Sequence, residues 1–109
     1  MAGNLGAFEQ AVLMAIVRLD DQSYGRAILR EVQERLERQV AAGAVHATLE
    51  RLERKGLLRS RLGSGTPIRG GRPRRFYRLQ PSGLRALNDA RAAVEALWRG
   101  LRWPLKGQA

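Results

Sequence analysis

The spacing of apolar residues changes twice along this chain, and the two changes fix the order of the elements it can form. Up to Gly56, apolar side chains recur every three or four residues, which is the period of an amphipathic helix. Between 57 and 79 they alternate with polar residues, as on a half-buried strand, around a stretch rich in Gly, Pro and Arg. From Pro81 the helical period returns. We therefore expect three helices, a two-stranded hairpin with a long basic loop, and a last helix.

Each of the first three expected helices has one apolar face. These faces comprise Phe8, Val12, Ala15, Ile16 and Leu19 in the first helix, Tyr24, Ile28, Val32 and Leu36 in the second, and Val45, Leu49 and Leu52 in the third. Ser23 is expected to cap the start of the second helix, and Lys55 followed by Gly56 is expected to end the third. Two strands, over 57–62 and 75–79, should then pair as the hairpin.

The last helix carries a seam of apolar residues. Pro81 suits the first position of a helix, and we expect this helix to run to about Leu101. Its apolar residues recur at alternating intervals of three and four, as in a coiled coil, and a helix projecting beyond a small core leaves such a seam in water. A second copy of the chain is the simplest candidate to cover this seam. The predicted dimerisation residues are Leu87, Ala90, Val94, Leu97, Trp98 and Leu101.

Positive charge is concentrated in one quarter of the chain. The net charge is +10, and residues 51–78 carry ten basic side chains against one acidic, Glu53, whereas the rest of the chain carries ten basic and nine acidic side chains. Such a surface favours a polyanion, because binding releases counterions from the phosphates of nucleic acid. The alternative is a solvated basic surface, but arginine predominates in this segment, and its guanidinium matches phosphates and guanine edges.

Three helices followed by a basic hairpin are the parts of a winged helix-turn-helix. In that fold the third helix enters the major groove of DNA and the hairpin, or wing, contacts the flanking backbone. We therefore predict a mainly α fold with a small β-hairpin (α+β class). It is divided into a winged helix-turn-helix DNA-binding domain over 1–80, a dimerisation helix over 81–103 and a flexible tail over 104–109. At 109 residues, the chain has room for one such domain.

The outer surface of the third helix is the expected reading surface. Arg51 can donate to guanine O6 and N7 and Glu50 can accept from cytosine N4, whereas Arg54 and Lys55 suit phosphates. A surface ion pair between Glu50 and Arg54, which are four residues apart, is an equally good interpretation of these two residues. Together with the wing, the predicted DNA-binding residues are Ala44, His46, Ala47, Thr48, Glu50, Arg51, Arg54, Lys55, Arg69, Arg72, Arg74 and Arg75.

Four strings in the sequence carry a family resemblance. They are LGAFEQ from Leu5, SYGRAI from Ser23, GAVHATLERLERKGL from Gly43 and GGRPRRFYRLQPSG from Gly70. Together they resemble the PadR family of transcriptional regulators, over nearly the whole chain. The resemblance implies a homodimeric winged-helix repressor of double-stranded DNA, in the short form with a single C-terminal dimerisation helix. Two positions depart from the family pattern: His46 stands where tyrosine is usual, and Gln80 where threonine usually caps the last helix.

A catalytic or metal-binding role is not expected. The chain has one histidine and no cysteine, so it lacks the usual metal-ligand clusters and nucleophile–base pairs, and we expect no enzyme activity, metal or cofactor. Asp20 and Asp21 are adjacent acids at a helix end, a pattern typical of solvated side chains. The glycines of the wing loop are not followed by the Lys-Ser/Thr of a phosphate loop. No segment predicts a membrane span or a signal peptide, so we expect a cytoplasmic location.

Two hypotheses about partners stay open. Trp98 flanks the apolar seam and offers a stacking surface for a small hydrophobic effector, although packing at the dimer contact explains it as well. The competing function is a basic architectural or RNA-binding protein that does not read sequence. Phe76 and Tyr77 argue against RNA, because neighbours on a strand point to opposite faces and cannot form one stacking platform.

Overall fold

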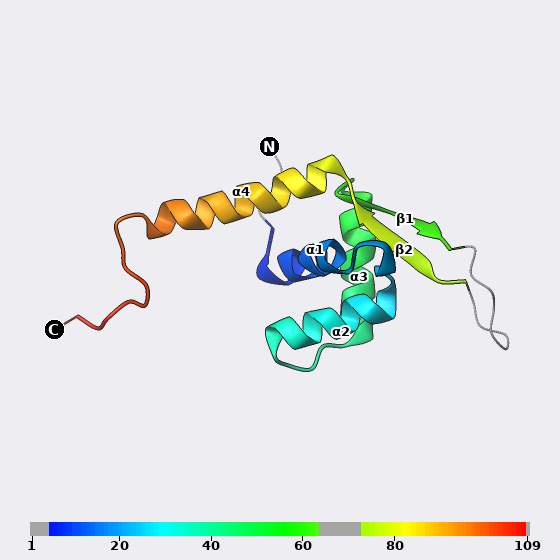
Figure 1. Cartoon of the computed structure of the whole chain (residues 1–109), viewed down its shortest axis with the longest axis horizontal. Helices are drawn as coiled ribbons and strands as arrows, with labels where there is room; N and C mark the ends of the chain where they lie inside the picture. The colour runs from blue at the N-terminus through cyan, green and yellow to red at the C-terminus, as the bar shows by residue number, and fades with distance from the viewer. Residues whose placement is uncertain (1–4, 64–72, 109) are drawn as a thin grey trace.

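The elements follow the order that the apolar spacing predicts (Figure 1). The computed structural model describes residues 5–63 and 73–108. These residues form α1 (Ala7–Leu19), the short 3₁₀ turn η1 (Asp20–Gln22), α2 (Gly25–Leu36), α3 (Ala42–Arg54), β1 (Leu58–Leu62), β2 (Arg75–Leu79) and α4 (Pro81–Trp98). The prediction of a mainly α fold with one small hairpin is confirmed.

Helix α1 lies at the centre of the fold, in contact with α2, α3, β2 and α4 (Figure 1). The predicted apolar faces of the first three helices meet around it, and Val12, Ile28 and Leu49 are buried there. Leu13 is also fully buried, although it lies off the predicted stripe, because neighbouring elements cover α1 on more than one side. The result is a small closed core that holds α3 and the hairpin in place.

The start of α2 differs from its prediction at Ser23. The N-cap residue is Tyr24, and the Ser23 hydroxyl is buried with no hydrogen-bond partner among the described residues. The carbonyl of Ser23 accepts a hydrogen bond from the Tyr77 N–H at 2.9 Å, and Tyr24 forms a β-bridge with Phe76. This segment therefore joins the edge of β2, which turns the Ser23 side chain inward, and the expected Ser23 cap is wrong.

A tight turn links α3 to β1 and also seats α4. The helix ends before Gly56 as predicted, and Gly56 adopts a left-handed φ of +78° that favours glycine. The Ser82 hydroxyl donates to the Gly56 carbonyl at 2.6 Å. A Cβ on Gly83 would overlap the Leu57 carbonyl oxygen, so only glycine lets α4 approach the turn this closely. Helix α3, the hairpin and α4 therefore meet at one closely packed junction.

Helix α4 is shorter than expected. Pro81 is its first residue, as predicted, but the helix ends at Trp98, because Gly100 adopts a left-handed φ of +85° directly after the capping residue Arg99. The predicted helix over 81–103 is therefore wrong at its C-terminal end, and Leu101 lies beyond the helix. None of the described helices is both long enough and apolar enough to cross a membrane.

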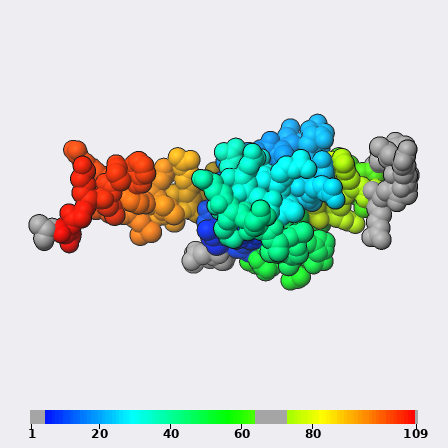
Figure 2. Space-filling model, turned by 90° about the horizontal axis from the view of Figure 1, so that it is seen from below, coloured from blue at the N-terminus to red at the C-terminus, as the bar shows by residue number. Residues whose placement is uncertain are grey.

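The second half of α4 projects from the body as an arm, seen in Figure 2. Its residues 91–98 are all exposed, and the protein measures 63 × 31 × 20 Å. Its radius of gyration is 16.5 Å, against about 13 Å for a compact chain of this length. Along the predicted seam, Leu87 and Ala90 are half-buried, whereas Val94, Leu97, Trp98 and Leu101 are exposed. The apolar surface left in water is thus the outer part of the seam.

Candidate nucleic-acid interface

The outer surface of α3 carries the predicted reading residues. The buried side of the helix packs against α1 and α2, which fixes the direction of the exposed side. Seven of the eight positions predicted in or directly after α3 are exposed: Ala44, His46, Ala47, Glu50, Arg51, Arg54 and Lys55. This surface combines cations, one acid and small apolar side chains, which suit phosphates, hydrogen bonds to base edges and contact with the thymine methyl group.

Thr48 does not lie on this surface. Only 3% of it is exposed, and its Oγ1 accepts a hydrogen bond from Nη2 of Arg51 at 3.3 Å. The expectation that Thr48 contacts DNA is therefore corrected: packing of α3 against the body turns it inward. Its hydroxyl supports the Arg51 guanidinium from behind.

Glu9 of α1 lies beside two of the predicted DNA-binding cations. Its Oε2 accepts hydrogen bonds from Arg51 Nε and Lys55 Nζ, both at 3.3 Å, and its Oε1 accepts one from the Gly6 N–H at 3.1 Å. Burial by itself raises the pKa of Glu9, but these hydrogen bonds together outweigh it and hold the pKa below its ordinary value. Sequence reasoning missed Glu9 because it precedes its partners by 42 and 46 residues and lies on another helix.

Glu50 pairs along α3 with His46. His46 and Glu50 are one helical turn apart, and the distance from His46 Nε2 to Glu50 Oε2 is 3.8 Å. Both side chains are exposed. Of the two residues four positions from Glu50, the described side chain of His46 lies near its carboxylate and that of Arg54 does not, so the alternative of a Glu50–Arg54 ion pair is not seen. Arg54 is therefore left exposed without an acidic partner among the described residues, as suits a phosphate contact.

A groove of about 490 Å³ runs beside the reading surface. Ala44, Ala47 and Arg51 form part of its α3 wall, and Phe8 and residues 38–41 lie across from them. The two alanine side chains end at Cβ, so the groove presents methyl groups next to a guanidinium. Alanine can contact the methyl group of thymine and arginine the edge of guanine, so this wall suits a base step that contains both.

The hairpin is attached to α3 through Glu53, the one acid of the basic segment. Glu53 accepts hydrogen bonds from the N–H of Ser60 at 3.0 Å and from its hydroxyl at 2.9 Å. The Ser60 Oγ in turn accepts a hydrogen bond from Nη1 of Arg75 at 2.9 Å. These bonds fix the base of the wing to the end of α3 and hold Arg75, a predicted DNA contact, at their junction.

Aromatic rings join the wing to the start of α2. The rings of Tyr24 and Phe76 meet edge to face, with 5.8 Å between their centroids and 71° between their planes. The Arg74 guanidinium carbon lies 4.1 Å from the centre of the Tyr24 ring, and that of Arg61 lies 5.3 Å from the centre of the Phe76 ring. Cation–π contacts of this kind hold Arg74, another predicted DNA contact, at the edge of the wing.

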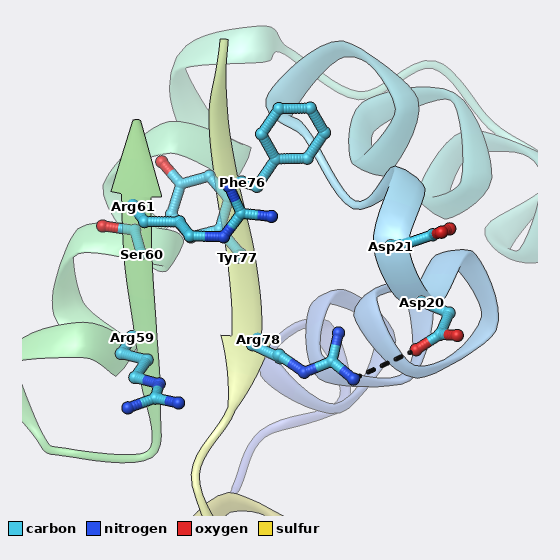
Figure 3. Close-up of a pocket in the computed structure, with 8 residues that line it drawn as sticks. All are labelled: Asp20, Asp21, Arg59, Ser60, Arg61, Phe76, Tyr77 and Arg78. Carbon is cyan, nitrogen blue, oxygen red and sulfur yellow. Dashed lines mark ion pairs between the residues drawn. The ribbon is translucent and has the colours of Figure 1, made fainter. Parts of the chain in front are cut away.

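A cavity of about 280 Å³ lies between the hairpin and η1 (Figure 3). It is lined by Asp20, Asp21, Arg59, Ser60, Arg61, Phe76, Tyr77 and Arg78, and the distance from Arg78 Nη2 to Asp20 Oδ1 is 3.5 Å. Three arginines that were left out of the predicted DNA contacts therefore gather here. The strand alternation contains the signal, since Arg59 pairs with Arg78 in the register and Arg61 follows two residues later on the same face.

Phe76 and Tyr77 point to opposite faces of β2, as the alternation predicts. Tyr77 is buried, and its burial raises the pKa of its hydroxyl, whereas Phe76 is half-buried against Tyr24. They do not form one stacking platform. The two remaining predicted wing contacts, Arg69 and Arg72, lie outside the described residues. In the part of the chain that the structure describes, no group of three or more His, Asp or Glu is placed to hold a metal ion.

Comparisons with known proteins agree with this architecture. The sequence model of the "Transcriptional regulator PadR-like family" matches residues 12–89. The transcriptional regulator Rv3488 of Mycobacterium tuberculosis is 38% identical over 80 residues, which make up 73% of this chain and 70% of that protein.

Two solved structures show the same fold. A PadR family transcriptional regulator of Eggerthella lenta has a TM-score of 0.64 and 29% identity, over 82% of this chain and 75% of its own. A PadR-like transcriptional regulator of Bacillus cereus has a TM-score of 0.72 and 19% identity, over 94% of this chain and 95% of its own.

Proposed function

The chain belongs to the PadR-like family of transcriptional regulators, and from that premise we propose that it is a homodimeric repressor that binds an inverted-repeat operator. In this proposal α3 reads bases in the major groove and the wing binds the flanking backbone. The family is one of regulators rather than enzymes. The observation that carries the proposal is the exposed surface of α3, where Arg51, Arg54 and Lys55 stand on a helix that the body holds rigidly.

The residues of this surface divide into two groups by the chemistry they offer. Arg51, with Ala44 and Ala47 beside it, suits base edges, and Glu50 and His46 lie close enough to influence the same contacts. Arg54, Lys55 and the wing arginines Arg74 and Arg75 suit phosphates. Arg69 and Arg72, which the sequence predicts as wing contacts, belong to this second group. We therefore expect specificity to depend on the first group and overall affinity on the second.

The arm of α4 supports the proposal of a homodimer. Val94, Leu97 and Trp98 on α4, and Leu101 just beyond its end, expose apolar surface that the other described residues do not cover. Pairing of two arms about a two-fold axis would bury this surface, and it would place two α3 helices to read half-sites about one helical turn apart. Trp98, in this arrangement, would lie at the contact between the subunits. The small hydrophobic effector predicted beside it stays a prediction.

Selection from a random duplex library tests this function. The full-length protein is incubated with the library at fixed salt, bound duplexes are amplified, and the enriched sequences are aligned. We expect an inverted repeat with half-site centres about 10 base pairs apart or a multiple of that spacing, and a complex with two chains per duplex by mass. Enrichment of a single, unrepeated site or of no sequence at all would contradict the proposal.

A further inference from the structure

We propose that Glu9 of α1 is a positioning residue for DNA recognition, which fixes the Arg51 side chain for base reading and withholds Lys55 from non-specific phosphates. The inference rests on the proposed function, since it assigns a role to a residue behind the proposed reading surface. The observation behind it is that the shielded Glu9 carboxylate binds both Arg51, a predicted base-reading residue, and Lys55, a predicted phosphate-binding residue.

The Glu9 carboxylate is held firmly enough to orient its partners. Its side chain is 12% exposed, and the Gly6 N–H anchors Oε1 at the start of α1. The other oxygen, Oε2, is left for Arg51 and Lys55, each at 3.3 Å. Charge-assisted hydrogen bonds to a shielded, immobile acceptor restrict a side chain more than a bond to a solvated one does. Glu9 thus acts on α3 from a fixed point on α1.

The bonds to Arg51 leave one edge of its guanidinium free. Nε donates to Glu9 and Nη2 donates to Thr48 Oγ1, so both occupied positions lie on the inner edge. Nη1 and the second N–H of Nη2 have no acceptor among the described residues. These are two parallel donors, the arrangement that guanine O6 and N7 accept. A guanidinium fixed in advance loses less conformational entropy on binding, which favours the correct base.

The bond to Lys55 acts in the opposite direction on non-specific DNA. Such DNA is bound through its phosphates, and each cation that reaches a phosphate adds affinity and salt dependence. Lys55 must leave Glu9 before it can make that contact. Through Lys55, Glu9 therefore lowers the phosphate affinity for any duplex, whereas through Arg51 it supports the reading of the correct sequence, and this second effect widens the ratio between the two affinities.

The test compares Glu9→Gln with a matched control, Glu31→Gln. Glu31 is 15% exposed and accepts a hydrogen bond from Arg35 at 2.8 Å, but both residues lie on α2. The two variants therefore change the net charge equally at similarly shielded carboxylates, although Glu9 has two cationic partners and Glu31 has one. Affinities are measured by fluorescence anisotropy for a duplex enriched from the random library and for a shuffled duplex of the same composition, over a series of salt concentrations.

For Glu9→Gln we expect the ratio of the two affinities to fall about tenfold or more, since one bidentate contact discriminates between bases by roughly 5- to 150-fold. The log–log salt slope on the shuffled duplex should steepen by about one for each phosphate gained. Glu31→Gln should leave the ratio and the slope unchanged. In an Arg51→Ala background, Glu9→Gln should no longer change the ratio, because its effect on specificity acts through Arg51.

Glu9→Asp is the control for a purely structural effect, because it keeps the negative charge and shortens the side chain by one methylene. It should also lower the ratio, with a melting temperature close to that of the native protein. A native ratio near one would overturn the proposed function and this inference with it. A high native ratio that neither Glu9→Gln nor Glu9→Asp lowers relative to Glu31→Gln would overturn the role of Glu9 alone.

Discussion

Leu97 offers the sharpest test of the role proposed for the arm of α4. It is 77% exposed in the single chain, and full burial of a leucine side chain is worth about 1.5–3 kcal/mol. Burial of its exposed part in a symmetric dimer is therefore worth about 1–2 kcal/mol per chain and about 2–4 kcal/mol per dimer. Leu97→Ala should accordingly weaken the dimer by up to roughly 30- to 700-fold. Leu97→Glu should weaken it further, because two like charges would lie near the axis with poor solvation.

Mass by light scattering across a dilution series, together with binding of the enriched duplex, measures both consequences. The control is Leu62→Glu, because Leu62 is 59% exposed at the end of β1, on the hairpin instead of the arm. We expect Leu97→Glu to be a monomer with greatly reduced specific affinity and Leu62→Glu to remain a dimer. A native monomer, or a Leu97→Glu variant that stays dimeric with unchanged specific affinity, would refute the role given to α4.

Four further results are expected. DNA affinity should fall with salt at a log–log slope of roughly −5 or steeper, because the basic segment occurs twice in a dimer; a nearly flat slope would contradict the electrostatic argument. Arg51→Ala should flatten discrimination at one base position by about 1–3 kcal/mol, whereas Arg74→Ala should weaken all duplexes alike; equal, uniform losses would remove α3 as the reader. Because Glu9 has a lowered pKa in the folded chain, it stabilises the fold above its unfolded pKa, and that stability is lost as pH falls through the folded pKa. Thermal denaturation should therefore show a smaller loss on acidification in Glu9→Gln than in the native protein. Gly83→Ala should lower the melting temperature by roughly 5 °C or more, since its Cβ would meet the Leu57 carbonyl oxygen; an unchanged melting temperature would disprove that close packing.

The arrangement of helices and strands could be predicted because the local pattern and the tertiary packing agree. Apolar residues at helical spacing in α1, α2 and α3 face one shared core, and alternation in β1 and β2 matches their antiparallel pairing. The end of α3 was predictable for the same reason, since Gly56 supplies the left-handed turn that follows it. The end of α4 depends on Gly100 in the same way, but the apolar spacing continues to Leu101 and suggested a longer helix.

The site residues could be predicted from the sequence only where the buried face of a single helix determines which side chains are exposed. The outer surface of α3 follows from the burial of Leu49 and Leu52, whereas Thr48 lies at the boundary of that face and packing turns it inward. Glu9 could not be found in this way, because its two partners lie on another helix and become neighbours only when α1 packs against α3. The β-bridge between Tyr24 and Phe76, with the hydrogen bond from the Tyr77 N–H to the Ser23 carbonyl, is likewise a contact between distant segments, and it overrides the local preference for a cap at Ser23.

Sequence-specific reading of duplex DNA by the basic surface of this chain can be measured in a single titration. The native protein is titrated, at one fixed salt concentration, with the enriched duplex, an unrelated duplex and a structured RNA. We expect the enriched duplex to bind at least about a thousandfold more tightly than the unrelated one, a difference of about 4 kcal/mol or more. Equal binding of the two duplexes, or tighter binding of the RNA, would contradict it and indicate a protein that uses the same charge without reading sequence.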